Sequence, residues 1–421
     1  MTEIILYNRQ FFRRCLVIAT VLLLPIYVQA QKYTLNDVLN KIEQNNPSVL
    51  AYQNRINAAN ENAKSARAWA PPKTAVEWDM LPYNFDYNKG SMLRLSAMQD
   101  FPNAKKNYAK EDYMKSMAVS EKYAGEFHKV ELFAEAKEAF YKIYISQRKV
   151  AVLQESGNAL KLMIDLGTKQ MAITKGELAP IYRLKARLTE NETMIVHEQN
   201  MLLSFQATLN FLMNEDVNRT FEIDTSGLIR DYRGLNTFLQ IDSLDCKRSD
   251  LMKMNSEINT AKLNQSFIAL RSKPEFGMKL EHYQRFGSMP NAFAVTGTMT
   301  IPSAPWSARG YKSEVRALDY RISAMEQDKK NMVNMAMQMI KMYLIELESE
   351  NRELDNYSLK VIPAYRKSLD ANILAYGQNT NDMNMTLMAW DDVLMSQMEY
   401  LKHLDTYFRI QTEYEKELQI R

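Results

Sequence analysis

The feature that most constrains this 421-residue chain is a long internal repeat. The segment Ile56–Ala59, followed by Pro72, recurs about 200 positions later as Ile258–Ala261, followed by Pro274. Further pairs near the same offset are Phe101–Asn103 with Ile301–Ser303, Tyr108 with Tyr311, and Gly176 with Gly377. A duplication of this length predicts two similar units that bury their apolar surfaces against each other or against further subunits.

The first 30 residues have the pattern of a cleaved secretory signal peptide. Arg9, Arg13 and Arg14 form a basic start, Cys15–Leu24 is apolar, and Val28–Ala30 suits a cleavage site. No other run reaches the roughly 18 apolar residues of a membrane helix. We therefore expect a protein that leaves the cytoplasm and has no helical membrane anchor.

The composition favours helix and argues against several partners. Glycine and proline are scarce, at 12 each, so few positions interrupt a helix. Only Cys246 remains after the signal peptide, which excludes an intrachain disulfide. The 53 Lys and Arg nearly balance the 50 Asp and Glu, so charge gives no reason to expect a nucleic-acid partner.

Two segments change from a helical to a two-residue period, which is typical of β-strands. Residues 75–100 alternate apolar and polar side chains on both sides of a turn-like stretch, 82–90. Residues 276–301 repeat this pattern around Gly287–Pro290. Each segment predicts a β-hairpin whose strands reach about 9–11 residues, the length of a tilted membrane-spanning strand. A half-buried sheet of a soluble domain is the alternative.

In the first half, helices are expected on both sides of the hairpin. Tyr33–Ala70 has the pattern of one helix with Thr34 as its N-cap. Residues 104–175 contain no proline and would extend for on the order of 100 Å as a helix. Gly176 then ends that helix at a tip, and a return helix is expected near 181–212.

The second half repeats this order. Leu318 and three methionines recur at every seventh position of a long helix expected over 307–362, which predicts coiled-coil packing. Pro363 is expected to kink or restart the helix, Gly377 to form the second tip, and residues 383–417 to return. The predicted organisation is a signal peptide at 1–30, a first repeat at 31–213, a linker at 214–245 and a second repeat at 246–421.

Several short motifs, in their order and duplication, resemble the outer membrane efflux protein family, the TolC-like exit ducts of Gram-negative bacteria. They are Asn46-Pro47 near the start, Pro102 and Pro302 closing the two hairpins, and Leu374–Gly377 at the second tip. The resemblance covers nearly the whole chain after the signal peptide.

This resemblance implies a mainly α-helical chain that contributes to a small β-barrel. Three chains would form a twelve-stranded outer-membrane barrel, continued by a periplasmic α-helical barrel. Its partners would be two further copies, outer-membrane lipid, a periplasmic membrane-fusion adaptor, and an inner-membrane pump, with the RND class as first choice. Trp78, Phe276 and Phe293 would face lipid, whereas Arg94, Lys279 and Glu281 would face water in the lumen.

The resemblance also places gating at the tips, where rings of acidic side chains narrow the channel. The candidate tip and gate residues are Gly176 and Glu177 in the first tip and Tyr376, Gly377 and Asp382 in the second. A threefold ring of Asp382 carboxylates would favour cations. The alternative is that Asp382 only caps the return helix.

The sequence contains no catalytic or cofactor-binding motif, and we expect neither an enzyme nor a cofactor. Met383, Met385 and Met388, near the second tip, are candidate contacts for Cu(I) or Ag(I), because thioethers are soft ligands. Packing of the helical core is the alternative role for methionine.

The sequence thus predicts an outer-membrane exit duct of a tripartite efflux system, with Cu or Ag among its possible substrates. Drugs, amphiphiles or secreted proteins of a type I system are alternative substrates. A periplasmic coiled-coil adaptor or scaffold is the alternative architecture, because it would share the signal peptide and the long helices.

Overall fold

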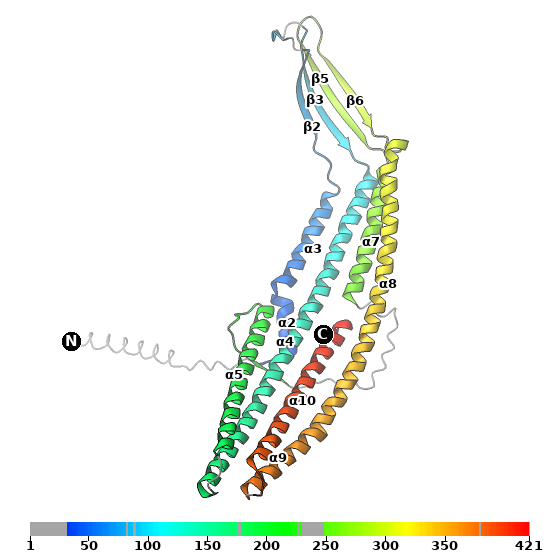
Figure 1. Cartoon of the computed structure of the whole chain (residues 1–421). Coiled ribbons are helices and arrows are strands. Elements are labelled where there is room, and N and C mark those ends of the chain that lie inside the picture. Colours follow the sequence, from blue (N-terminus) through cyan, green and yellow to red (C-terminus); the bar gives the residue numbers. More distant parts are fainter. Residues whose placement is uncertain are drawn as a thin grey trace, which may run out of the picture.

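The computed structural model describes residues 32–80, 83–86, 90–174, 178–225, 228, 248–378 and 380–420. The predicted signal peptide and Cys246 lie outside these residues. The chain forms an elongated rod with a β-sheet at one end and two helical tips at the other (Figure 1). Its elements are β1 Lys32–Tyr33, α2 Leu35–Asn45, α3 Pro47–Ser65, β2 Lys73–Asp79, β3 Met92–Phe101, α4 Ala104–Thr174, α5 Ala179–Met213, β4 Glu222–Ile223, α7 Ser249–Ala269, η1 Leu270–Ser272, β5 Phe276–Arg285, β6 Ala292–Met299, α8 Pro305–Asn356, η2 Tyr357–Val361, α9 Ile362–Gly377 and α10 Met383–Glu417.

The first helix is interrupted where one continuous helix was expected. Thr34 and Asp37 form a capping box that starts α2, as the sequence indicated. Asn46 has an extended backbone because Pro47 follows it, and it therefore ends α2 and caps α3. Its side-chain amide donates to the carbonyl of Leu212 over 2.8 Å, which anchors the break on α5.

The two hairpins join into one antiparallel sheet with the strand order β2-β3-β5-β6. The central pair, β3 and β5, comes from different halves of the chain and pairs from Met92 with Arg285 to Phe101 with Phe276. Each hairpin therefore supplies one of the two central strands, and neither hairpin forms the sheet without the other. A further short parallel pair, β1 with β4, lies near the middle of the rod.

Helix α4 is the central helix of the rod, and α3, α5, α7 and α10 pack against it. Its 71 residues extend for about 107 Å at ~1.5 Å per residue. Helices α3 and α7 pack along its half nearer the sheet, and α5 and α10 along the half nearer the tips (Figure 1). The start of α7 meets the end of α10, where Arg248 Nη1 lies 2.6 Å from Glu417 Oε2.

Helix α8 has the buried row that the coiled-coil prediction requires, but beyond Lys329 this row passes through other residues than the predicted methionines. Leu318, Ile322 and the half-buried Met325 start the buried row, but it then continues through Val333 and Ala336 rather than Met332. One additional four-residue step at Lys329 accounts for this shift. Such an insertion locally unwinds a coiled coil, so Met332 and Met339 lie beside the seam and are only half buried.

A π-helical turn, η2, precedes the proline that was expected to disturb this helix. Pro363 lies in the first turn of α9, where its missing N–H and fixed φ are tolerated. The expected restart is therefore present, and the one-turn π segment at Tyr357–Val361 lies directly before it.

Two apolar clusters hold the helices together. The larger lies near the middle of the rod, where the rings of Tyr141 and Phe408 stack with centroids 4.3 Å apart. The smaller lies near the tips and contains Leu160, Trp390 and Val393. Both clusters join α4 to α10, so they connect the two repeats.

Candidate functional site

The strand register divides the sheet into an apolar face and a polar face. Trp78, Phe276 and Phe293 lie on the same face, because Trp78 shares it with Val76, which aligns through Leu95 and His282 with Phe293. The exposed members of this apolar face are Val76, Trp78, Leu95, Phe276, Met278, Leu280, Phe293, Val295 and Met299. A continuous exposed apolar surface of this kind indicates contact with an apolar environment.

The opposite face carries charge. The Arg94 guanidinium bonds to Glu77 over 3.1 Å and to Asp79, and Lys279 Nζ lies 2.7 Å from Glu281 Oε1. The residues expected to face water therefore share one surface, opposite Trp78, Phe276 and Phe293. Such alternation suits a wall between an apolar and an aqueous phase.

Strands β2 and β6 are the two edges of this sheet. Within the described residues, each pairs with a neighbour on one side only. The outward row of N–H and C=O groups on each edge is open to pairing with another strand.

The second tip brings together three residues predicted from the sequence. Tyr376 and Gly377 end α9, and Asp382 is at the N-cap position of α10. Asp382 does not cap the helix through its side chain; its carboxylate instead accepts a hydrogen bond from the Asn384 amide over 2.9 Å. Burial raises the pKa of the Tyr376 hydroxyl, and the charge of Asp382 raises it further. Gly176 and Glu177, of the first tip, lie outside the described residues.

At the tips, polar contacts join the return helix of the first repeat, α5, to that of the second repeat, α10. Arg187 on α5 lies 3.3 Å from Asp391 on α10, and Arg183 donates to Asn384 over 3.2 Å. Burial raises the pKa of Asp391, while the positive charge of Arg187 lowers it in part. Our sequence reasoning missed these residues, because each pair is separated by about 200 positions and has no local motif.

Comparison with known proteins identifies the fold. No protein-family model matches the sequence, and no curated protein was found as a relative. Solved structures match over most of the chain. CusC, described as forming a transmembrane channel, has a TM-score of 0.76 at 11% identity and covers 91% of both chains. VceC, an outer membrane protein of Vibrio cholerae, has a TM-score of 0.73 at 14% identity and covers 91% of this chain and 95% of its own. OprN, an outer-membrane channel, has a TM-score of 0.72 at 14% identity and covers 91% and 89%.

The chain has the TolC-like outer-membrane channel fold. The predicted fold class, mainly helical with a small sheet, is therefore confirmed for the described residues.

In this TolC-like chain, the three candidate methionines lie in different environments. Met383 is 3% exposed, and a Cβ added at Gly167 on α4 would lie 3.0 Å from its Cε. Met385 and Met388 are exposed, and Met395 continues the same side of α10 at the helical spacing. Met383 is thus a packing residue here, and Met385, Met388 and Met395 form an exposed methionine stripe.

Among the described residues, no three His, Cys, Asp or Glu side chains are arranged to hold a metal ion. None of the described helices combines the length and apolar character needed to cross a membrane.

Proposed function

We propose that this protein is a passive exit duct of the Gram-negative outer membrane and acts in a tripartite efflux system. The observation that carries the proposal is a four-stranded sheet with an exposed apolar face and two open edges, at the end of a helical rod of about 100 Å. The duct has no energy source and no catalytic role of its own.

Trimerisation follows from the open edges. An unpaired strand edge is not tolerated in lipid, because its N–H and C=O groups would lose their hydrogen bonds to water. Three copies would pair β2 of one chain with β6 of the next and close a twelve-stranded barrel. The duplicated helix pairs would then form a continuous periplasmic tube.

The exposed side chains support a membrane position for the sheet. Trp78, Phe276 and Phe293 would contact the hydrocarbon of the bilayer. Trp69, before β2, and Trp306, in the first turn of α8, are 61% and 84% exposed near the end of the sheet that adjoins the helices, where an aromatic girdle would meet the lipid headgroups.

The tips would be the contact with the remaining components. A periplasmic membrane-fusion adaptor would dock its helices on the helical surface, and an inner-membrane pump, of the RND class in our proposal, would supply the energy. The gate would be formed by the two tips, including Gly176, Glu177, Tyr376, Gly377 and Asp382.

The experiment for the duct is a single-channel recording combined with disulfide crosslinking. In a Cys246→Ser background, Val76→Cys on β2 is paired with Cys at positions 293, 295 and 297 on β6. We expect covalent trimers for one of these pairs and stepwise conductance in a planar bilayer. A protein that remains monomeric at all three positions and conducts no ions contradicts the proposal.

For the substrate, we propose Cu(I) or Ag(I), because the exposed methionine stripe on α10 provides soft ligands. Growth of a deletion strain across gradients of Cu, Ag and bile salts tests this choice. A deletion strain that is sensitive to Cu or Ag alone supports metal efflux, if the wild type restores its resistance and Met385→Leu/Met388→Leu/Met395→Leu does not. Sensitivity to bile salts or drugs alone assigns the duct to a multidrug system, and loss of a secreted protein to type I secretion.

The competing architecture is a periplasmic scaffold. Such a protein would be released from membranes by high salt, whereas an integral barrel requires detergent. Release without detergent would contradict the outer-membrane location, and the exposed apolar face of the sheet would then need another partner.

A further inference from the structure

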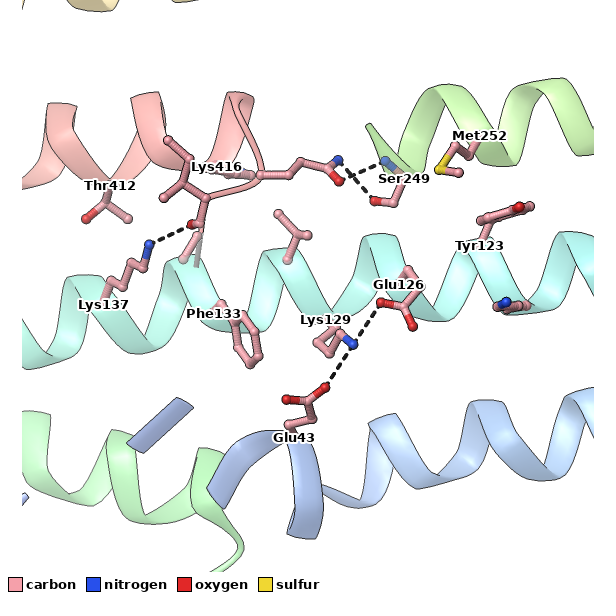
Figure 2. A pocket seen from close by; sticks show the side chains of 15 residues that line it. Glu43, Tyr123, Glu126, Lys129, Phe133, Lys137, Ser249, Met252, Thr412 and Lys416 are labelled. Atoms are coloured by element: carbon pink, nitrogen blue, oxygen red, sulfur yellow. Dashed lines mark hydrogen bonds and ion pairs between the residues drawn. The ribbon is translucent and has the colours of Figure 1, made fainter. Parts of the chain in front are cut away.

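A cavity of about 510 Å³ lies near the middle of the rod, away from the sheet and the tips. It opens where the end of α10 and the start of α7 meet alongside α4, with α2 on the other side (Figure 2). Residues from all four helices line it. Its volume is in the range of cavities that bind small molecules.

The lining carries more positive than negative charge. Four lysines, Lys122, Lys129, Lys137 and Lys416, face two carboxylates, Glu43 and Glu126. Both carboxylates are engaged by one of the four lysines: Lys129 Nζ lies 3.1 Å from Glu43 and 2.8 Å from Glu126 (Figure 2). Burial lowers the pKa of Lys129, but these two bonds outweigh it, leave the pKa raised and keep the ammonium protonated.

The other three lysines differ in how well their charge is neutralised. Lys137 is fully paired in the floor of the cavity by Glu415 and by the carbonyl of Ile420. Within the part of the chain that the structure describes, the one carboxylate within ion-pair distance of Lys416 is Glu413, at 3.7 Å on its own helix. Lys122, among the described residues, has no carboxylate within ion-pair distance. Over the described residues, the lining therefore has surplus positive charge from Lys122 and Lys416.

The rest of the lining is apolar. Phe133 and Ala134 form a buried floor on α4, and Val130, Met252 and Ile420 extend it. A ligand that matches both parts needs one anionic group and an aliphatic or aromatic body.

We propose that this cavity binds a monoanionic amphiphile, with its apolar body on Phe133 and Ala134 and its anionic group attracted by Lys122 and Lys416, the lining lysines that lack a close carboxylate from another element. The site goes beyond the duct function and does not depend on it. Because the ligand would contact α4, α7 and α10 together, it would also stabilise the junction between the two repeats.

The test uses decanesulfonate, which is singly charged, and 1-decanol, which has a chain of the same length without the charge. The full-length protein is purified in an uncharged detergent, and ligand adducts are counted by native mass spectrometry during a titration. We expect saturation at one decanesulfonate per protomer and no saturable binding of decanol. Lys122→Gln/Lys416→Gln should weaken the apparent Kd about tenfold or more.

The matched control is Lys169→Gln/Lys402→Gln, which removes the same charge from exposed positions on the same two helices, α4 and α10. Its Kd should stay within about twofold of the wild type.

Ala134→Phe fills the floor and should abolish binding, provided that thermal unfolding remains cooperative. The absence of saturable binding in the wild type, or equal weakening in the control, overturns the proposal. A protein that conducts ions without binding decanesulfonate loses only this site, and one that binds it without conducting loses only the duct.

Discussion

Lys137 and Glu415 show how a single pair of side chains connects the two repeats. Their side chains are 3% and 1% exposed, and Lys137 Nζ also donates to the Ile420 carbonyl over 3.0 Å. Each member needs the other, because a buried charge without a partner is costly. The pair joins the middle of α4 to the last turns of α10.

Removing one member of this pair should destabilise the protein strongly. Lys137→Met leaves the Glu415 carboxylate buried without its cation, and we expect a loss of about 3–5 kcal/mol. Lys137→Met/Glu415→Met should recover most of it, because no charge remains to be buried. Because membrane oligomers unfold irreversibly, apparent unfolding temperatures recorded at one scan rate rank the wild type, the single variant and the double variant, and the single variant should unfold at the lowest temperature. A double variant as unstable as the single one would contradict this explanation.

The capping box of α2 makes a local contribution that depends on pH. The side-chain and backbone hydrogen bonds from Thr34 lower the pKa of Asp37 below its usual 3.8. A carboxylate with a lowered folded-state pKa stabilises the fold above its unfolded pKa, and this is lost as the pH falls through the folded value. Thr34→Ala should therefore cost about 1 kcal/mol near neutral pH and less well below pH 3.8, where the bond from the Thr34 hydroxyl to the carboxylate is already weakened and mainly the cap on the Asp37 N–H is lost. Hydrogen exchange of the α2 amides, at matched intrinsic rates, measures the difference; a cost that is independent of pH would contradict it.

At the scale of elements, the alternation of side chains along the strands gives the sheet an apolar face and a polar face. Leu280 lies on the apolar face and pairs with Val295, whereas Ala294 lies on the polar face opposite Glu281. These two exposed or half-buried positions are close in space and differ mainly in the side of the sheet they face.

This pair of positions allows a matched test of membrane contact. If the sheet lies in the outer membrane as proposed, Leu280→Arg should cost about 2–4 kcal/mol and reduce the amount of folded protein there, because its charge would face hydrocarbon. Ala294→Arg should be tolerated, because Glu281 opposes it in water. Heat-modifiable migration of membrane fractions measures folding. Equal levels of the two variants would contradict the assignment of the faces.

The contacts between the helical tips are weaker than those of the core. Arg187 and Asp391 are partly exposed, so their ion pair contributes about 0.2–1 kcal/mol. A contact of that size can hold a closed arrangement and still be broken by a docking partner.

Loss of this ion pair should favour the open tip. For Arg187→Gln we expect the open fraction of single channels to rise by up to about fivefold, which corresponds to ~1 kcal/mol. Arg352→Gln removes an exposed arginine whose ion pair, among the described residues, is with Glu348 on the same helix, and it should leave the open fraction unchanged. An unchanged open fraction in Arg187→Gln would show that the pair does not hold the gate.

At the scale of the whole molecule, symmetry would multiply the effect of one residue. Asp382 lies at the second tip and would occur three times around the axis of a trimer. Three carboxylates around one opening attract cations and repel anions. Asp382→Asn should therefore lower the ratio of cation to anion permeability, measured as a reversal potential in a salt gradient. A cation preference that survives this substitution would leave Asp382 with a structural role only.

Much of the architecture could be read from local patterns. The tip and return of the second repeat were expected near Gly377 and at 383–417, and α9 and α10 have these bounds. The strands were expected at 75–100 and 276–301 and are present with small differences at their ends. The break at Asn46 was missed as a helix end, although Pro47 was the signal that could have revealed it. The shift in α8 at Lys329 does not follow from the sequence pattern, because the seven-residue spacing of the methionines predicts a seam through Met332.

The sequence alone determined the elements, their duplication and the two faces of each strand, because the period of apolar side chains is a local property of the backbone. Only the tertiary structure decided the β3–β5 pairing, the Lys137–Glu415 pair, the Arg187–Asp391 contact and the split of the methionines between Met383 and the exposed stripe. Each depends on which segments, about 180 to 280 residues apart, pack against α4 or against each other, and no local periodicity carries that information.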